Sequence, residues 1–336
     1  MSAPRILTTV VGSYPVPEWL RAYPTRQNLI DATMVVLKTQ ERAGIDVVAD
    51  GELYRFDVNH PETNGMIDYF IRPMSGITSE ISRETLEGFR RESGLAYRTE
   101  PAGVVPGEIG EGMLNLPRAY RMVRPLTGAQ LKFTVTGPHM LSKVLMDRHY
   151  GDRARLADAV AEVLARQVAD IDAEVVQVDE ANIPGHPEEA PWAAAAINRV
   201  LDAVKGEKAV HVCFGNYGGQ TIQRGTWEAL VPFLVALRAD HLVLEFKRPG
   251  IDHAACLKDL PDRIGIGLGV IDIKDNRVES AEEIAGDIER AERAVGKGRI
   301  RYIHPDCGFW MLQRNVADRK IAALVRGRDL FEGRHS

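Results

Sequence analysis

Short runs of apolar residues alternate along this chain with longer stretches in which apolar residues recur at helical spacing. The short runs are typical of buried strands, and the longer stretches of amphipathic helices. Eight runs predict strands, at residues 6–11, 45–49, 131–136, 175–179, 208–213, 241–246, 264–270 and 300–304. Six stretches predict helices, at residues 27–43, 154–172, 190–205, 226–238, 280–296 and 315–328. Ser280 and Glu283 have the spacing of a capping box at the start of the fifth helix.

This alternation of strands and helices is typical of parallel sheets covered by helices. Eight units predict a (β/α)8 TIM barrel. A doubly wound open sheet is the alternative, but no G-x-G-x-x-G sequence follows the first strand. Residues 72–128 interrupt the alternation and are rich in glycine, proline and charge. We therefore expect one TIM-barrel domain over residues 1–336, with an insertion at about 72–128, after the second strand, that forms a hairpin or excursion over one end of the barrel.

Composition narrows the functional classes. The chain has 336 residues, of which 45% are hydrophobic and 26% charged, and this is ordinary globular composition. A net charge of −5 without long basic runs argues against nucleic acid as a partner. The N-terminal apolar stretch is too short for a signal peptide, and no run is long enough to span a membrane. We expect a cytoplasmic protein, in which three cysteines act as metal ligands, catalytic groups or core residues rather than as disulfides.

Polar side chains follow nearly every predicted strand. Active sites of (β/α)8 barrels lie at the carboxyl ends of the strands, so these side chains should converge on one rim. In chain order they are Ser13, Glu52, Asp179 with Glu180, His211 with Cys213, Glu245, Asp272 with Lys274, and Cys307.

A candidate metal centre stands out on this rim. His211 and Cys213 lie two residues apart in a strand and therefore face the same side. Together with Glu245 on the adjacent strand and Cys307 after the last one, they form a ligand set that suits Zn²⁺. The alternative is that Cys213 and Cys307 are small buried apolar residues, as free cysteines often are. Cys256 lies in a helix-like stretch, and we expect it to be a packing residue.

Seven motifs carry a resemblance that spans about residues 5–328. In order they are T-T-V-V-G-S-Y-P, D-G-E-L-Y-R, T-G-P, V-Q-V-D-E-A, H-V-C-F-G-N-Y, G-V-I-D-I-K and H-P-D-C-G. They resemble the C-terminal catalytic domain of cobalamin-independent methionine synthases, in a short form that has only the catalytic half. The resemblance also implies the barrel fold.

The resemblance implies roles for individual residues. His211, Cys213, Glu245 and Cys307 correspond to the ligands of a catalytic zinc ion, with Glu245 as the weakly held ligand. Ser13, Glu52 and Asp179 correspond to residues that bind homocysteine: two carboxylates suit its ammonium group, and a hydroxyl suits its carboxylate. Lys274 takes the place of the family's proton-relay histidine, so Asp179 and Lys274 are the catalytic candidates. The implied reaction activates a thiol as a zinc thiolate and transfers a methyl group to it, forming methionine.

Two departures from the family leave the methyl donor open. The N-terminal barrel that helps to hold polyglutamyl folate is missing, and no tryptophan directly follows T-G-P. A methylated corrinoid, free or protein-bound, is therefore an alternative donor to folate. Short relatives also resemble epoxyalkane:coenzyme M transferase, in which the same zinc activates another thiol. Arg55, Lys247 and Arg248 lie near the rim and could receive the sulfonate of coenzyme M.

Other classes of function are also compatible with a barrel. The zinc could be structural, the chain could be a degenerate homologue acting as a partner subunit, or the site could be that of a metal-free decarboxylase. The presence of all four ligand residues argues against degeneration, and a decarboxylase needs neither H-x-C nor P-D-C-G.

Overall fold

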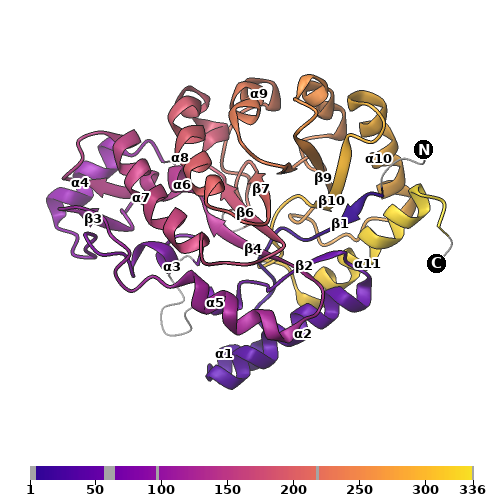
Figure 1. Cartoon of the computed structure of the whole chain (residues 1–336), viewed down its shortest axis with the longest axis horizontal. Coiled ribbons are helices and arrows are strands. Elements are labelled where there is room, and N and C mark those ends of the chain that lie inside the picture. The colour runs from indigo at the N-terminus through magenta and orange to yellow at the C-terminus, as the bar shows by residue number, and fades with distance from the viewer. Residues whose placement is uncertain (1–4, 57–64, 96–97, 217–218, 335–336) are drawn as a thin grey trace.

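The computed structural model describes residues 5–56, 65–95, 98–216 and 219–334. Within them, eight parallel strands form one sheet in the order β1-β10-β9-β8-β7-β6-β4-β2 (Figure 1). The strands are β1 (Leu7–Thr8), β2 (Val47–Ala49), β4 (Gln130–Thr136), β6 (Val175–Glu180), β7 (Glu207–Val212), β8 (His241–Leu244), β9 (Gly265–Ile271) and β10 (Ile300–Pro305). Isolated bridges join Thr9 to Val47 and Ser13 to Gly51, so the two edge strands meet and the sheet closes. The predicted barrel is confirmed, and the open sheet was the wrong alternative.

Each predicted strand has its counterpart in the barrel. The largest difference in length is at β1, where residues 6–11 were expected and only Leu7–Thr8 form a continuous ladder. Beyond Thr8 the chain forms two isolated bridges, from Thr9 to Val47 of β2 and from Ser13 to Gly51 just after β2. The apolar pattern continues there because the residues remain buried, whereas the hydrogen-bond ladder does not.

Helices cover the outside of the barrel between successive strands (Figure 1). The six predicted helices are present as α2 (Arg26–Ala43), α7 (Arg153–Val168), α8 (Ala190–Asp202), α9 (Trp227–Ala236), α10 (Ala281–Val295) and α11 (Arg314–Phe331). A 3₁₀ helix, η5 (Ile251–Asp259), connects β8 to β9. The predicted capping box is confirmed, since Ser280 and Glu283 each accept a hydrogen bond from the other's backbone N–H.

Several short helices were not predicted from the sequence. Three to six residues are too few to show a helical period. They are α1 (Glu18–Ala22), α3 (Asp68–Ile71), α6 (Pro138–Lys143) and the 3₁₀ helices η1 (Leu53–Arg55), η2 (Arg124–Leu126), η3 (Ile183–Gly185) and η4 (Pro187–Glu189).

The segment between β2 and β4 contains α4 (Arg83–Glu92), β3 (Gly103–Val105) and α5 (Leu116–Val123). Strand β3 pairs in parallel with β5 (Leu145–Asp147), which follows the third barrel strand β4. An antiparallel bridge also joins Thr78 to Val104. Figure 1 shows α4 and β3 at the end of the molecule opposite α10 and α11.

The barrel strands bury both apolar and polar side chains. A small apolar cluster, separate from the main core, contains Val11, Val47, Val175, Ala209, Val243 and Tyr302. The polar side chains of Lys132, Gln177 and His304 are buried as well, and Lys132 pairs with Val175 of this cluster in the sheet. Gln177 contacts both Lys132 and Asp179, so these buried polar side chains adjoin the rim where the sequence places its candidate site.

Glycines on β9 make room for bulky side chains inside the barrel. A Cβ on Gly267 would lie 3.0 Å from Nε2 of His304, and one on Gly269 would lie 2.3 Å from Oδ1 of Asp306. Asp306 uses this space to accept hydrogen bonds from the backbone N–H groups of Phe246 and Lys247. The G-I-G-L-G sequence therefore lets β10 tie the loop before Cys307 to the end of β8.

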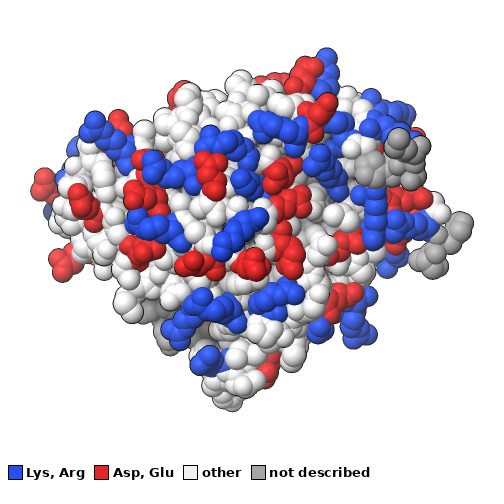
Figure 2. All heavy atoms as spheres, in the orientation of Figure 1, with Lys and Arg blue, Asp and Glu red and all other residues white. Residues whose placement is uncertain are grey.

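The surface carries mixed charge. Lys and Arg side chains alternate with Asp and Glu over the face shown in Figure 2. Over the part of the chain that the structure describes, no helix combines the length and apolar character needed to cross a membrane.

Candidate active site and metal centre

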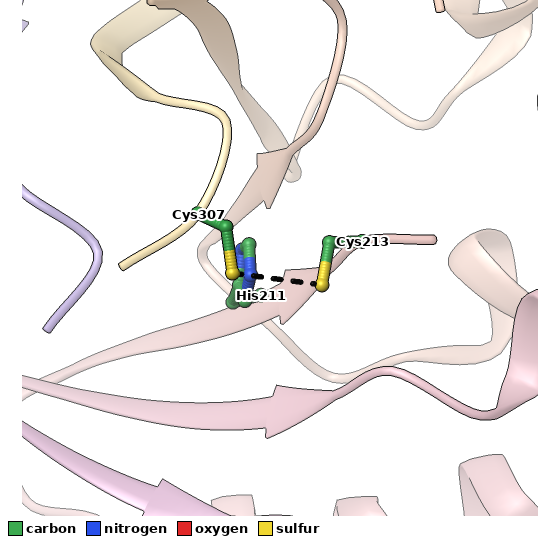
Figure 3. Close-up of side chains that lie close together, drawn as sticks. All are labelled: His211, Cys213 and Cys307. Atoms are coloured by element: carbon green, nitrogen blue, oxygen red, sulfur yellow. Dashed lines mark hydrogen bonds between the residues drawn. The ribbon is translucent and has the colours of Figure 1, made fainter. Parts of the chain in front are cut away.

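His211, Cys213 and Cys307 converge at the carboxyl end of the barrel (Figure 3). His211 belongs to β7, Cys213 directly follows it, and Cys307 lies in the loop after β10. One ligand atom from each of the three lies within 4.8 Å of the other two. The sulfur atoms of Cys213 and Cys307 are 3.8 Å apart. A nitrogen and two sulfurs at this separation could be bound by one tetrahedral Zn²⁺.

The imidazole of His211 is oriented as a metal ligand requires. Its Nδ1 lies 2.8 Å from the carbonyl oxygen of Val243, so Nδ1 donates and Nε2 is left with its lone pair. Nε2 is buried and has no hydrogen-bond partner in the described part of the chain. Histidines that bind metals commonly donate their other N–H to a carbonyl in this way. The donor set and this unpartnered nitrogen therefore fit zinc.

The two thiols have opposite shifts in pKa. The hydrogen bond from Cys213 lowers the pKa of Cys307 well below its usual value, and His211 adds to this effect. The same hydrogen bond, together with burial, raises the pKa of Cys213. Cys307 is thus the thiol of the pair that loses its proton more readily. Cys256 is half-buried on η5 and is not part of this group.

Glu245, the expected fourth ligand, lies beside this group and is held by other partners. Its Oε1 is 2.9 Å from Nζ of Lys274, and its Oε2 accepts a hydrogen bond of 2.8 Å from the N–H of Phe214. The side chains of Glu245 and Lys274 are almost fully buried. Burial lowers the pKa of Lys274, but Glu245 raises it more, so the lysine is a charged partner of the carboxylate.

Glu52 is placed by an unusual backbone and by a neighbouring glycine. It has a φ of 58°, and it is the one non-glycine residue with positive φ in the described part of the chain. Its carboxylate passes over Gly12, where a Cβ would lie 2.3 Å from Oε1. Thr134 donates a 2.5 Å hydrogen bond to the same oxygen, and Arg55 lies 3.3 Å from it. Strained backbone of this kind is found at functional sites.

Asp179 is the last but one residue of β6 and lies opposite His211 in the ladder between β6 and β7. Its Oδ1 accepts a 2.7 Å hydrogen bond from Nε2 of Gln177. Burial raises the pKa of Asp179 to about 7; Glu52 also raises it, while His211 acts in the opposite direction. Asp179 and Glu52 thus act on each other inside one buried site.

Ser13 lies beside the Cys307 loop. A Cβ on Gly308 would lie 2.0 Å from Oγ of Ser13, so the glycine allows the two segments to approach. The carbonyl of Ser13 also accepts a hydrogen bond from Phe309. The structure therefore brings the predicted site residues to one end of the barrel.

Sequence reasoning missed the polar residues beneath this rim. Lys132 and Gln177 were read as parts of apolar strands, yet both side chains are buried in the barrel. The alternation of strand residues could have identified them, because Gln177 lies two residues before Asp179 and must share its face. Thr134, which binds both Glu52 and Arg55, lies two residues after Lys132 and follows the same rule.

A second buried polar cluster follows the T-G-P sequence. The ring of His139 lies 3.1 Å from Glu180 and 2.8 Å from Glu189, and Glu189 also accepts a hydrogen bond from Lys143. The ring of Trp192 packs against His139, with 4.7 Å between centroids. A tryptophan therefore lies next to the segment after T-G-P in space, although it comes from α8.

The charge of His139 predicts a pH dependence of stability. Burial lowers its pKa, but Glu180 and Glu189 raise it more, to about 9 in the folded protein. Its contribution is therefore fully present below about pH 6.5, the usual pKa of histidine, and is lost as the pH rises to about 9. We expect the free energy of unfolding of the wild type to fall across this range by on the order of 2–3 kcal/mol more than that of His139→Gln. Urea unfolding at several pH values measures this difference, and parallel curves for the two proteins would contradict it.

Three basic residues near the rim are already paired with acids. Arg55 contacts Glu52, while Nζ of Lys247 lies 2.6 Å from Asp287 and Nη1 of Arg248 lies 3.0 Å from Asp272. A sulfonate would have to displace a carboxylate to bind any of them.

Comparison with known proteins agrees with this architecture. Residues 6–327 match the family model described as the catalytic domain of cobalamin-independent synthase. The methionine synthase of Thermococcus kodakarensis is 30% identical over 343 residues, which cover 97% of this chain and 94% of the relative. That of Pyrococcus horikoshii is 29% identical and covers 98% and 94%. A B12-independent methionine synthase from Shewanella sp. W3-18-1, solved in complex with selenomethionine, has the same fold, with a TM-score of 0.80, 22% identity and 98% of both chains covered.

Proposed function

This chain belongs to the cobalamin-independent methionine synthase family, and we propose that it is a zinc-dependent methyltransferase that converts homocysteine to methionine. The observation that carries the proposal is the convergence of His211, Cys213 and Cys307, with Nδ1 of His211 bound to a carbonyl and Nε2 left without a partner. The relatives from Thermococcus and Pyrococcus carry the name methionine synthase. When bound, Zn²⁺ would lower the pKa of the substrate thiol, so that the sulfur reacts as a thiolate near neutral pH.

We assign the metal ligands as His211, Cys213, Cys307 and Glu245. Glu245 is the weakest of the four, because Lys274 and Phe214 already occupy both of its oxygens. Lys274 balances the charge of Glu245 whether or not that carboxylate binds metal. We therefore propose that Lys274 holds the fourth ligand, Glu245, in place. The family has a histidine at this position, and the lysine would serve here without an imidazole that titrates.

The amino-acid part of the substrate fits the neighbouring polar groups. Asp179 and Glu52 supply two carboxylates for its ammonium group, and Ser13 supplies a hydroxyl for its carboxylate. In the transfer, a sulfur–carbon bond forms at homocysteine while the bond between the methyl carbon and its donor breaks. The pairing of Arg55, Lys247 and Arg248 with acids disfavours coenzyme M as the acceptor.

X-ray absorption at the zinc K-edge, with and without homocysteine, tests this function. We expect zinc in the purified protein, with one nitrogen and two sulfur neighbours before the thiol is added. Homocysteine should add a sulfur neighbour or replace a lighter one. Zinc whose ligands ignore homocysteine would contradict homocysteine as the acceptor, and coenzyme M in the same experiment would then identify the alternative thiol.

The methyl donor is the second part of the proposal. We propose a methylated corrinoid rather than polyglutamyl folate, because no tryptophan directly follows T-G-P in the segment where the family's folate-stacking ring is expected. Methionine formation from homocysteine with methylcobalamin should be at least about tenfold faster than with methyltetrahydrofolate, a difference in barrier of about 1.4 kcal/mol. Robust turnover with the folate would contradict this choice and would suggest that Trp192 takes the place of the missing ring.

A further inference from the structure

Lys132 is a fully buried lysine on a barrel strand, and its Nζ reaches the residue that contacts Asp179 of the candidate site. It lies on β4, is 1% exposed, and donates a 2.8 Å hydrogen bond from Nζ to Oε1 of Gln177. Burial lowers its pKa to about 7, against the opposing effects of Asp179, Glu52 and Glu207. Among the described residues no carboxylate forms a salt bridge with Lys132, and the charged form of a buried amine without such a partner is costly.

Gln177 stands between this lysine and the carboxylate of Asp179. Its Nε2 donates a hydrogen bond of 2.7 Å to Oδ1 of Asp179 and one of 2.9 Å to the carbonyl oxygen of Val11. Since Oε1 accepts from Lys132, all three contacts fix the amide in one orientation. Lys132 and Asp179 thus interact through an amide and do not form a direct ion pair.

The absence of that direct pair matters for substrate binding. An ammonium group that reaches Asp179 must compete with any protein cation already bound there. A direct pair between Lys132 and Asp179 would satisfy the carboxylate in the empty enzyme. With Gln177 in place, one oxygen is held by a neutral donor and Oδ2 is available to the substrate.

We propose that Gln177 is a positioning residue that separates Lys132 from Asp179, so that Asp179 can recognise the ammonium group of an amino-acid substrate. The inference rests on the proposed function, in which Asp179 receives that group. Gln177 itself touches neither the substrate nor the metal ligands in this scheme. Its effect is on specificity for amino acids over otherwise identical molecules that lack the amino group.

The test compares the dissociation constants of methionine and of 4-(methylthio)butanoate, its analogue without the amino group. The wild type should bind methionine more tightly. In Gln177→Ala, the lysine can reach Asp179, and methionine should bind about 10- to 100-fold more weakly, the range for losing a hydrogen bond to a charged group. The affinity for the analogue should change by less than about threefold. Gln177→Asn should also weaken methionine binding, because its side chain is one methylene too short to contact both Lys132 and Asp179. This substitution leaves a smaller cavity than Gln177→Ala.

A second substitution tests whether weaker methionine binding in Gln177→Ala comes from contact between Lys132 and Asp179 or from disturbed packing of the barrel. Adding Lys132→Met to Gln177→Ala removes the competing cation and should restore most of the preference for methionine. Gln167→Ala is the matched control, because this glutamine is also buried but binds Leu116 and Glu111 away from the site; it should leave the preference unchanged.

The outcomes distinguish this inference from the proposed function. A wild type that binds both molecules equally would overturn the role of Asp179, and the inference with it. A clear preference in the wild type that persists in Gln177→Ala and Gln177→Asn would overturn the inference alone. Failure of Lys132→Met to restore the preference in the double variant would also overturn the inference and leave the proposed function standing.

Discussion

Replacing Cys307 with serine is expected to abolish methionine formation and to weaken zinc binding by about 100-fold or more, since even residues that only support a metal ligand contribute 10- to 100-fold. Cys307 is the thiol of the candidate centre that ionises more readily: its pKa is held well below the usual value by the hydrogen bond from Cys213 and by the neighbouring His211. A serine hydroxyl at this position stays protonated and is a poor ligand for zinc. Zinc content after dialysis against a chelator, measured together with turnover, gives the result.

Cys256→Ser is the matched control for this experiment. Cys256 is half-buried on η5 and lies outside the metal group, so its substitution should leave zinc content and turnover close to wild type. Circular dichroism should show that both variants keep the barrel. Full activity of a metal-free preparation, or normal zinc content in Cys307→Ser, would contradict the assignment of the metal centre.

Arg55→Met should destabilise the protein by about 3 kcal/mol or more, the range for removing one partner of a buried ion pair. The guanidinium of Arg55 is almost fully buried and lies 5.1 to 5.6 Å from the ring centroids of Tyr54, Tyr69 and Phe70. It also donates to the hydroxyl and carbonyl of Thr134. Methionine fills the same space but leaves Glu52 buried without its cation. Urea unfolding at pH 7 measures the loss.

Arg83→Met provides the comparison for Arg55→Met. The side chain of Arg83 is 90% exposed and pairs with Glu87 on the surface of α4, so its loss should cost less than about 0.5 kcal/mol. If Arg55→Met were as stable as Arg83→Met, the ion pair with Glu52 would be a minor contact. Glu52 would then keep its position through Thr134 and its backbone alone.

The barrel could be predicted from the sequence because the same pattern, an apolar run followed by a helical period, recurs along the chain. Apolar runs such as residues 264–270 and helical periods such as residues 280–296 depend on burial, and each of the eight units gives the same pattern. The structure disagrees with the pattern where pairing is decided by distant segments, as in residues 6–11. The parallel pairing of β3 with β5 also joins segments on either side of β4, and no local pattern predicts it.

The candidate site was predictable in its residue types and only partly in its contacts. His211 and Cys213 share a face by strand geometry, and their convergence with Cys307 follows once the barrel closes. That Lys274 binds Glu245 could not be read from the sequence, because the side chains come from different strand ends. The orientation of His211 is likewise set by a carbonyl on the neighbouring strand.

The sequence by itself therefore determined the fold class, the rim on which the chemistry lies and the identity of the metal-ligand candidates. Periodicity and chain order are local properties, and a parallel barrel brings the carboxyl ends of all its strands together whatever their details. Only the tertiary structure decided which side chains hold one another. Glu52 reaches the site because Gly12 has no side chain, and Asp179 remains unpaired with Lys132 because Gln177 lies between them. Contacts of this kind depend on distances between strands that are far apart in the chain, and on the cost of leaving a buried charge without a partner.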